Sequence, residues 1–188
     1  MTQIIGRPTF TLGSEKGLNM ETFDLAMLAL RIWLAAVMVA HGLNHGRNLD
    51  GTASWFASKG FANSRVLAVL SSAGEVAIGL GLALGLATPL AAAGLIAVMT
   101  TAFWSIHRFA GFFVFARPDE GYEYVVSLAV AAALLATIGP GEASLDAVVG
   151  LDLAGGWGAL IALGGVLAAG AQLAVLWRKP EERSADVT

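Results

Sequence analysis

The fold is decided by residues 66–106, VLAVLSSAGEVAIGLGLALGLATPLAAAGLIAVMTTAFWSI. They form two apolar runs of about 20 residues, the length that a helix needs to cross the roughly 30 Å hydrocarbon core of a bilayer. Only Ala87 and Thr88 separate the runs. Thr88 is suited to cap the second helix and Pro89 to begin its first turn. The stretch therefore predicts an antiparallel hairpin of two membrane-spanning helices.

Three further apolar runs extend this pattern along the chain. We place the five spans at residues 25–44, 66–86, 89–106, 124–138 and 157–177. The fourth run is short, and we expect its helix to begin near Gly121 and to end at the Gly139-Pro140-Gly141 turn. The sequence therefore predicts an all-α integral membrane protein.

The composition excludes several other classes of protein. Of the 188 residues, 56% are hydrophobic and only 13% are charged, whereas a soluble domain has about 25% charged residues. Cysteine is absent, so this chain has no disulfide, no thiolate metal site and no thiol redox chemistry. The net charge is −3 and the 11 Lys and Arg residues are scattered, which argues against nucleic acid as a partner.

The Lys and Arg residues outside the spans are unevenly distributed. With five spans, Arg7 and Lys16 lie on one side of the membrane. The other side carries Arg47, Lys59, Arg65, Arg108, Arg117, Arg178, Lys179 and Arg183. Because cytoplasmic loops carry the excess of Lys and Arg, we expect a multi-pass protein of the cell (inner or plasma) membrane. Its N-terminus should lie outside and its C-terminus in the cytoplasm.

Three ionisable residues fall within the expected spans, namely Arg31, His41 and Glu75. A charged side chain at a helix centre costs about 2.5 to 3.5 kcal/mol on insertion scales, so such residues face the bundle interior. Glu75 lies between Arg31 and His41 in depth, because the two helices are antiparallel. Two interpretations stay open. In the first, Arg31, His41 and Glu75 together form a proton-handling or ligand-binding series in the bundle interior. In the second, Glu75 only fixes the register of the helices.

A second group of polar and aromatic residues is expected where four helix ends meet on the cytoplasmic side. It comprises His45, Trp55, Phe56, His107, Tyr122 and Glu123 together with His41. Histidines and a carboxylate suit a divalent metal, and two axial histidines suit haem. No longer motif surrounds these histidines. We therefore expect a polar pocket without a tightly bound metal.

Residues 48–64 are not simply hydrophilic, because aromatic side chains alternate with polar ones. At helical spacing, Trp55 and Phe56 lie on one apolar side of a short amphipathic helix. Asp50 or Thr52 would cap this helix and Gly60 would end it. The helix is either an interfacial anchor or a lid above the polar pocket.

Several short motifs, taken in order, resemble those of the DoxX family of small integral membrane proteins. They are His41-Gly42, GTASWF at 51–56, Gly60-Phe61, Glu75 in a Gly-rich helix, GYEY at 121–124, Gly139-Pro140-Gly141 and Ser144-Leu145-Asp146. The resemblance covers about residues 23–147. Two features depart from it: His45 stands where the family pattern has a Lys, and the fifth helix lies beyond the usual four.

The resemblance implies a four-helix membrane bundle, to which this chain adds a fifth, C-terminal transmembrane helix. We divide the chain into a polar N-terminal segment (1–22), the DoxX-like bundle (23–147), the extra transmembrane helix (148–178) and a polar tail (179–188). The fifth helix is Gly-rich between Gly155 and Gly170, and small residues let helices approach closely. We expect a partner helix to pack there.

Some relatives in this family are subunits of a thiosulfate:quinone oxidoreductase. The resemblance thus implies a membrane subunit of an oxidoreductase or respiratory-type complex that offers a quinone-facing, proton-facing or scaffold surface, with the redox centres in partner proteins. Two alternatives stay open, a non-enzymatic scaffold or accessory subunit and a small proton-coupled transporter using Glu75. We expect no catalysis by this chain alone, no tightly bound cofactor, quinone as the candidate ligand, and the bilayer and other membrane or membrane-associated subunits as partners.

Overall fold

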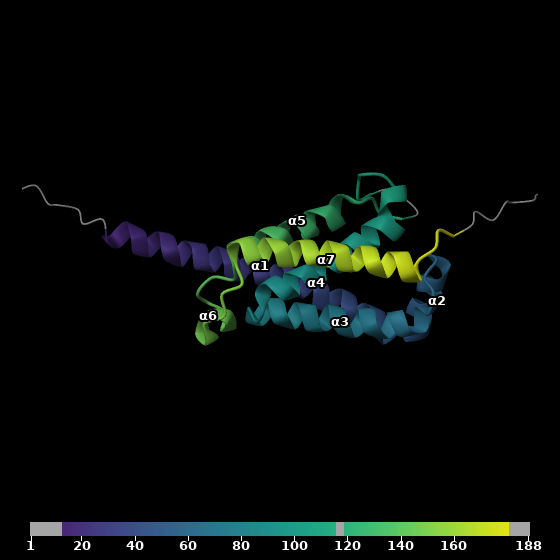
Figure 1. Cartoon of the computed structure of the whole chain (residues 1–188), viewed down its shortest axis with the longest axis horizontal. Helices are drawn as coiled ribbons and strands as arrows, with labels where there is room; N and C mark the ends of the chain where they lie inside the picture. Colours follow the sequence, from purple (N-terminus) through teal and green to yellow (C-terminus); the bar gives the residue numbers. More distant parts are fainter. Residues whose placement is uncertain (1–12, 116–118, 181–188) are drawn as a thin grey trace, which may run out of the picture.

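The computed structural model describes residues 13–115 and 119–180, and it is built from helices (Figure 1). They are α1 (Gly13–Arg47), α2 (Leu49–Ser58), α3 (Ser64–Leu84), α4 (Thr88–Ser105), the 3₁₀ helix η1 (His107–Phe109), α5 (Glu123–Ile138), α6 (Leu145–Val149) and α7 (Gly155–Leu176). Four of them, α1, α3, α4 and α7, are long and apolar enough to cross a membrane, and α5 is a shorter apolar helix. The predicted all-α membrane fold is confirmed.

The five apolar helices lie side by side and alternate in direction along the long axis of the molecule (Figure 1). We call one end the α6 end, where α3 and α5 finish and α4 and α7 begin, and the other the α2 end. Helix α4 is central because it packs against α3, α5 and α7. Its buried side chains Leu95, Ile96 and Met99 belong to the main hydrophobic core.

Two glycines let α1 and α3 approach each other closely. A Cβ atom on Gly42 would lie only 2.7 Å from the carbonyl oxygen of Ser72, and one on Gly79 would lie 2.9 Å from that of Ala35. Small residues at such contacts are the usual basis of tight helix packing in membranes. This contact fixes the register of α1 against α3, and with it the position of the site described below.

The structure corrects three predicted helix boundaries. Helix α2 is capped by Asn48, whose side chain accepts a hydrogen bond from the Gly51 amide, and not by Asp50 or Thr52. Helix α4 has Ala87 at its N-cap position, so Thr88 is its first residue and not its cap. Helix α5 begins at Glu123, two residues after the predicted start. In the first case the residue directly before α2 provides the acceptor, and in the second the acceptor is Asp146, far along the chain.

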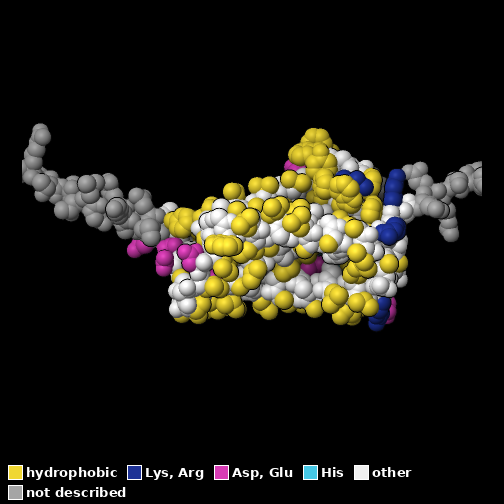
Figure 2. All heavy atoms as spheres, viewed as in Figure 1, with side chains coloured by type: hydrophobic (Ala, Val, Ile, Leu, Met, Phe, Trp, Pro, Cys, Tyr) yellow, Lys and Arg dark blue, Asp and Glu magenta, His cyan; other side chains and the backbone are white. Residues whose placement is uncertain are grey.

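Charges are segregated to the two ends, and the surface between them is mostly apolar (Figure 2). Acidic side chains gather at the α6 end, and Lys and Arg at the α2 end. Between the ends, large apolar side chains such as Leu160, Leu167 and Val175 are more than half exposed, as lipid-facing side chains are. Arg7, Arg117 and Arg183, which entered the orientation count, lie outside the described residues. The chain is thus a multi-pass membrane protein, and its orientation stays a prediction.

Candidate functional site

A cavity of about 400 Å³ lies inside the bundle towards the α2 end, between α2, α3, α4 and α7. Most of its wall is apolar, with Leu67, Leu70, Ile78, Val98 and Leu176 among the side chains that line it. Figure 2 shows acidic atoms at the bottom of a hollow in the otherwise apolar face between α7 and α3, and Glu75 is the acid that lines the cavity. A mostly apolar cavity with a few converging polar groups is the usual form of a small-molecule site.

Glu75 is the central polar group of this cavity. It lies midway along α3 and is only 2% exposed. Its Oε1 atom accepts a hydrogen bond from the Ser71 hydroxyl one turn earlier, and His45 Nδ1 lies 3.3 Å from the same oxygen. Its Oε2 atom is buried and has no hydrogen-bond partner among the described residues. A buried polar atom without a partner costs roughly 1 to 3 kcal/mol, so a hydrogen-bonding ligand at Oε2 would be favourable.

His45 connects Glu75 to the α2 end of the molecule. Its side chain is 20% exposed, so the ring bridges the buried carboxyl and the surface. Trp55 and Phe56 of α2 lie against it, with ring centroids 6.3 Å and 6.0 Å away. Phe56 in turn contacts Phe61 at 5.7 Å. These three aromatic side chains, which we call the aromatic lid, all line the cavity.

Three more polar residues line the cavity opposite Glu75. The Thr101 hydroxyl of α4 is buried and has no hydrogen-bond partner within the described parts of the chain. The Ser105 hydroxyl donates to the Thr101 carbonyl oxygen at 2.7 Å, and Gln172 comes from α7. The cavity therefore has unsatisfied hydrogen-bonding groups on two facing helices.

The C-terminal helix α7 holds the aromatic lid in place. The Trp177 indole donates to the Lys59 carbonyl oxygen at 2.9 Å. Backbone hydrogen bonds also join Ala62 to Leu176 at 2.8 Å and Arg178 to Gly60 at 2.9 Å. Because Gln172 and Leu176 also line the cavity, α7 is a wall of the site.

The structure separates the three intramembrane residues singled out in the sequence. Glu75 pairs with His45, while His41 is exposed on α1. Arg31 is fully buried, and its guanidinium donates to the Ala143 carbonyl oxygen and interacts electrostatically with Asp146. Arg31 thus belongs to the α6 end, far along the bundle from the Glu75 cavity.

Asp146 completes the junction at the α6 end. Its two carboxylate oxygens accept hydrogen bonds from the backbone amides of Ala87 at 2.6 Å and Thr88 at 2.8 Å, which caps α4. Ala87 has a φ of 46°, a conformation that residues other than glycine seldom adopt. The junction ties α1, α4 and the segment before α7 together, and we assign it a structural role.

The residues predicted for an interfacial pocket divide into two groups. His45, Trp55 and Phe56 line the cavity. His107 instead lies near the start of α5, where its ring contacts the Tyr124 hydroxyl at 2.8 Å and the Glu120 carbonyl oxygen at 2.6 Å. Tyr122 packs on Phe103 and Phe112, and Glu123 accepts a hydrogen bond from the Val114 amide at 3.2 Å. Within the described residues, no three metal-ligating side chains cluster together.

Sequence reasoning missed Ser71, Thr101 and Gln172 as cavity residues. Ser71 had a usable signal, since it precedes Glu75 by one helical turn. Thr101 and Gln172 had none, because hydroxyl and amide side chains are tolerated at many positions in membrane helices. Their relevance emerges only from the packing of α4 and α7.

Comparison with known proteins identifies one family. Residues 26–108 match the model of the DoxX family, a span that includes α2, α3, α4 and every cavity residue except Gln172 and Leu176. No curated protein and no solved structure matches the chain. Residues 26–108 are therefore similar to the DoxX family, which confirms over this part of the chain the resemblance seen in the sequence.

Proposed function

We propose that the chain is a membrane subunit of an oxidoreductase or respiratory-type assembly and that its Glu75 cavity binds a quinone-type ligand. Such a ligand is amphipathic, with a ring that needs hydrogen bonds and a tail that needs an apolar environment. The cavity offers both, because its walls are apolar and because Glu75 and Thr101 each present a polar atom that has no partner among the described residues. The unpartnered Oε2 atom of Glu75 is the observation that carries the proposal.

Glu75 suits both forms of a quinone-type ligand. A protonated carboxyl donates a hydrogen bond to a ring carbonyl, and a carboxylate accepts one from a ring hydroxyl. Oε1 accepts the hydrogen bond from Ser71 and lies 3.3 Å from His45 Nδ1, whereas Oε2 has no partner among the described residues. Glu75 therefore orients the ring and holds a proton next to it.

His45 provides a route for that proton. Its Nδ1 atom faces Glu75, and part of its side chain is exposed at the α2 end. The imidazole ring has two nitrogens, and each of them can carry a proton. A proton on Glu75 can thus pass to the aqueous phase through His45 without opening the cavity.

Redox centres are assigned to partner subunits. The chain has no cysteine for thiol chemistry or cluster ligation. The electron transfer that a bound quinone would supply therefore needs a donor or acceptor on another polypeptide. In this arrangement the chain binds and orients the ligand and exchanges its proton.

Tryptophan fluorescence tests the proposal, because Trp55 lies in the cavity wall. The purified chain in lipid nanodiscs is titrated with a short-chain ubiquinone analogue, whose ring quenches nearby tryptophan. We expect saturable quenching that Glu75→Leu weakens at least tenfold in affinity. The matched control Glu21→Gln changes an exposed acid and should leave the affinity unchanged. Linear quenching without saturation, or saturation unaffected by Glu75→Leu, would contradict the proposal.

A further inference from the structure

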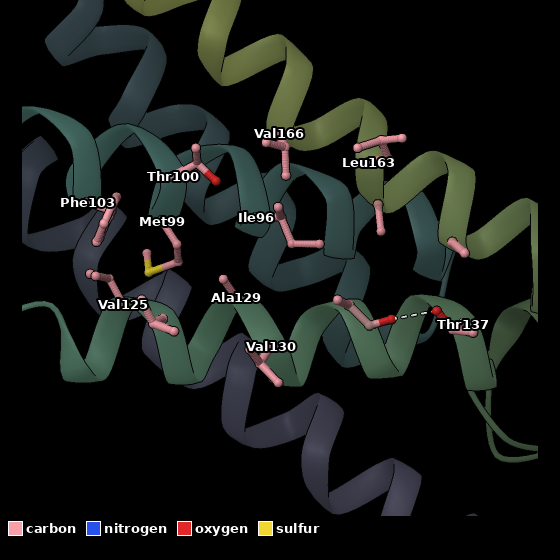
Figure 3. Close-up of a pocket in the computed structure, with 14 residues that line it drawn as sticks. Ile96, Met99, Thr100, Phe103, Val125, Ala129, Val130, Thr137, Leu163 and Val166 are labelled. Atoms are coloured by element: carbon pink, nitrogen blue, oxygen red, sulfur yellow. Dashed lines mark hydrogen bonds between the residues drawn. The ribbon is translucent and has the colours of Figure 1, made fainter.

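A second hollow, of about 460 Å³, lies between α4, α5 and α7 on a different face of α4. Figure 3 shows Ile96 and Met99 of α4, Ala129 and Val130 of α5, and Leu163 and Val166 of α7 converging on it. Thr100 and Thr137 are the polar side chains in its wall, and the Thr137 hydroxyl already donates to the Ala133 carbonyl oxygen at 2.8 Å. We call this hollow the lipid-facing groove. Its lining suits a hydrocarbon occupant.

The groove is long. It extends on α5 from Val125 to Thr137, which is about 18 Å at 1.5 Å per residue. Apart from Thr100 and Thr137, the side chains along it are apolar. The groove therefore offers an extended apolar surface that suits a hydrocarbon chain.

Cations and aromatic rings cluster just beyond the groove, at the α2 end of α4 and α7. The Arg108 guanidinium lies 4.0 Å from the Trp104 ring, 4.4 Å from the Phe109 ring and 6.0 Å from the Trp177 ring. The Lys179 ammonium lies 5.7 Å from the same Phe109 ring. Cations and tryptophans at helix ends are typical of residues at the level of lipid headgroups.

This cluster retains its positive charge for an external partner. Nearby basic residues are paired, since Lys59 bonds to Asp119 at 2.8 Å and Arg65 pairs with Asp50. The contacts of Arg108 are instead to rings and to the Trp104 carbonyl oxygen. Among the described residues, neither Arg108 nor Lys179 forms an ion pair with a carboxylate.

The groove and the cluster are close enough for one ligand to occupy both. Phe103 lines the groove and directly precedes Trp104. Arg108 follows Phe103 by five residues, in the 3₁₀ helix η1 that follows the end of α4. An anionic headgroup at the cluster would thus place its hydrocarbon tail at the mouth of the groove.

We infer that this face of the protein binds one anionic phospholipid, with its phosphate at Arg108 and Lys179 and an acyl chain in the lipid-facing groove. Basic pockets between transmembrane helices are recognised sites for anionic headgroups. The inference is independent of the function proposed for the Glu75 cavity.

Native mass spectrometry of the full chain in mild detergent tests the inference, with dioleoylphosphatidylglycerol (anionic) and dioleoylphosphatidylcholine (zwitterionic) as probes. We expect one phosphatidylglycerol to be retained in preference to phosphatidylcholine. Arg108→Gln and Lys179→Gln should each weaken its binding about fivefold, corresponding to about 1 kcal/mol per basic side chain near an anionic surface. Arg108→Lys, which keeps the charge, should weaken the binding of phosphatidylglycerol less than Arg108→Gln does.

Three controls make the result decisive. Arg47→Gln removes an exposed cation at the same end and should have little effect. Ala129→Phe fills the groove and should weaken retention of the lipid, whereas Leu134→Phe, at an exposed position outside the groove, should not. Glu75→Leu should leave lipid retention unchanged, which separates this site from the cavity.

Three outcomes would overturn the inference. These are equal retention of the two lipids, equal effects of Arg47→Gln and Arg108→Gln, and conversion of a dimer to a monomer by Ala129→Phe. The last would show that a second copy of the chain covers the groove.

Discussion

Replacing Asp146 by alanine should destabilise the α6 end more than any change at an exposed acid. The substitution removes the acceptor for two backbone amides, those of Ala87 and Thr88. It also leaves the fully buried Arg31 without its neighbouring carboxylate. The two hydrogen bonds to the charged carboxylate contribute about 1.5 to 3 kcal/mol each, and the loss of its electrostatic interaction with Arg31 adds to them. Because these contributions overlap, we expect a loss of about 3 to 5 kcal/mol.

Thermal unfolding in mild detergent, followed by circular dichroism, measures this loss. For a chain of this size, 1 kcal/mol corresponds to about 2 to 4 °C in Tm, so Asp146→Ala should lower Tm by on the order of 10 °C. Asp152→Ala is the matched control, because Asp152 is exposed and accepts one hydrogen bond at 3.2 Å from Ala154. Equal shifts for the two variants would refute the reasoning. The double variant Arg31→Leu with Asp146→Leu should recover part of the loss, since no unpaired charge remains buried.

Two further predictions concern helix packing and orientation. Gly42→Ala should lower the free energy of unfolding by about 1 to 3 kcal/mol through overpacking against Ser72. Gly46→Ala should be neutral or slightly stabilising, because a Cβ there meets ordinary contacts at 3.7 Å. Denaturation of both variants in detergent measures the difference. Single cysteines introduced at Asp152 and at Lys179 should react with a membrane-impermeant maleimide only from the outside and only from the cytoplasmic side, respectively. Labelling of both from one side would show that the number of spans is wrong.

The membrane helices could be predicted from the sequence because the length of an apolar run is itself the physical requirement for crossing a bilayer. Four of the five predicted spans lie within two residues of the observed helix boundaries at both ends. The first does not, since α1 continues beyond the apolar run to Gly13 and Arg47. Polar residues can extend a helix outside the bilayer, and hydropathy does not detect them.

The partners of the polar side chains could not be predicted in the same way. Helix counting gives the depth of a residue in the membrane but not the direction that it faces relative to its neighbours. Depth placed Glu75 between Arg31 and His41, yet the close approach at Gly42 sets the register that brings His45 to Glu75. Arg31 interacts electrostatically with Asp146, a residue 115 positions later in a short helix that folds back onto the bundle. No local sequence pattern indicates that α6 folds back onto the bundle.

The predicted interfacial pocket divides into two groups of residues for the same reason: the sequence does not show which direction each residue faces. Topology correctly brought His45, Trp55 and His107 to one end of the bundle. The central helix α4 separates them, because Thr101 and Ser105 line the cavity while His107 turns towards Tyr124. Only the observed packing assigns His45 to the cavity and His107 to the start of α5.

Photo-crosslinking with an azido-quinone tests the central proposal most directly, because it reports where the ligand binds. The full chain in nanodiscs is irradiated with the probe, and the labelled peptides are mapped by mass spectrometry. We predict labelling of residues 55–56 and 71–75, suppressed by excess unlabelled ubiquinone analogue and by Glu75→Leu. Labelling confined to the lipid-facing groove, or labelling that Glu75→Leu leaves undiminished, would contradict a quinone site at Glu75.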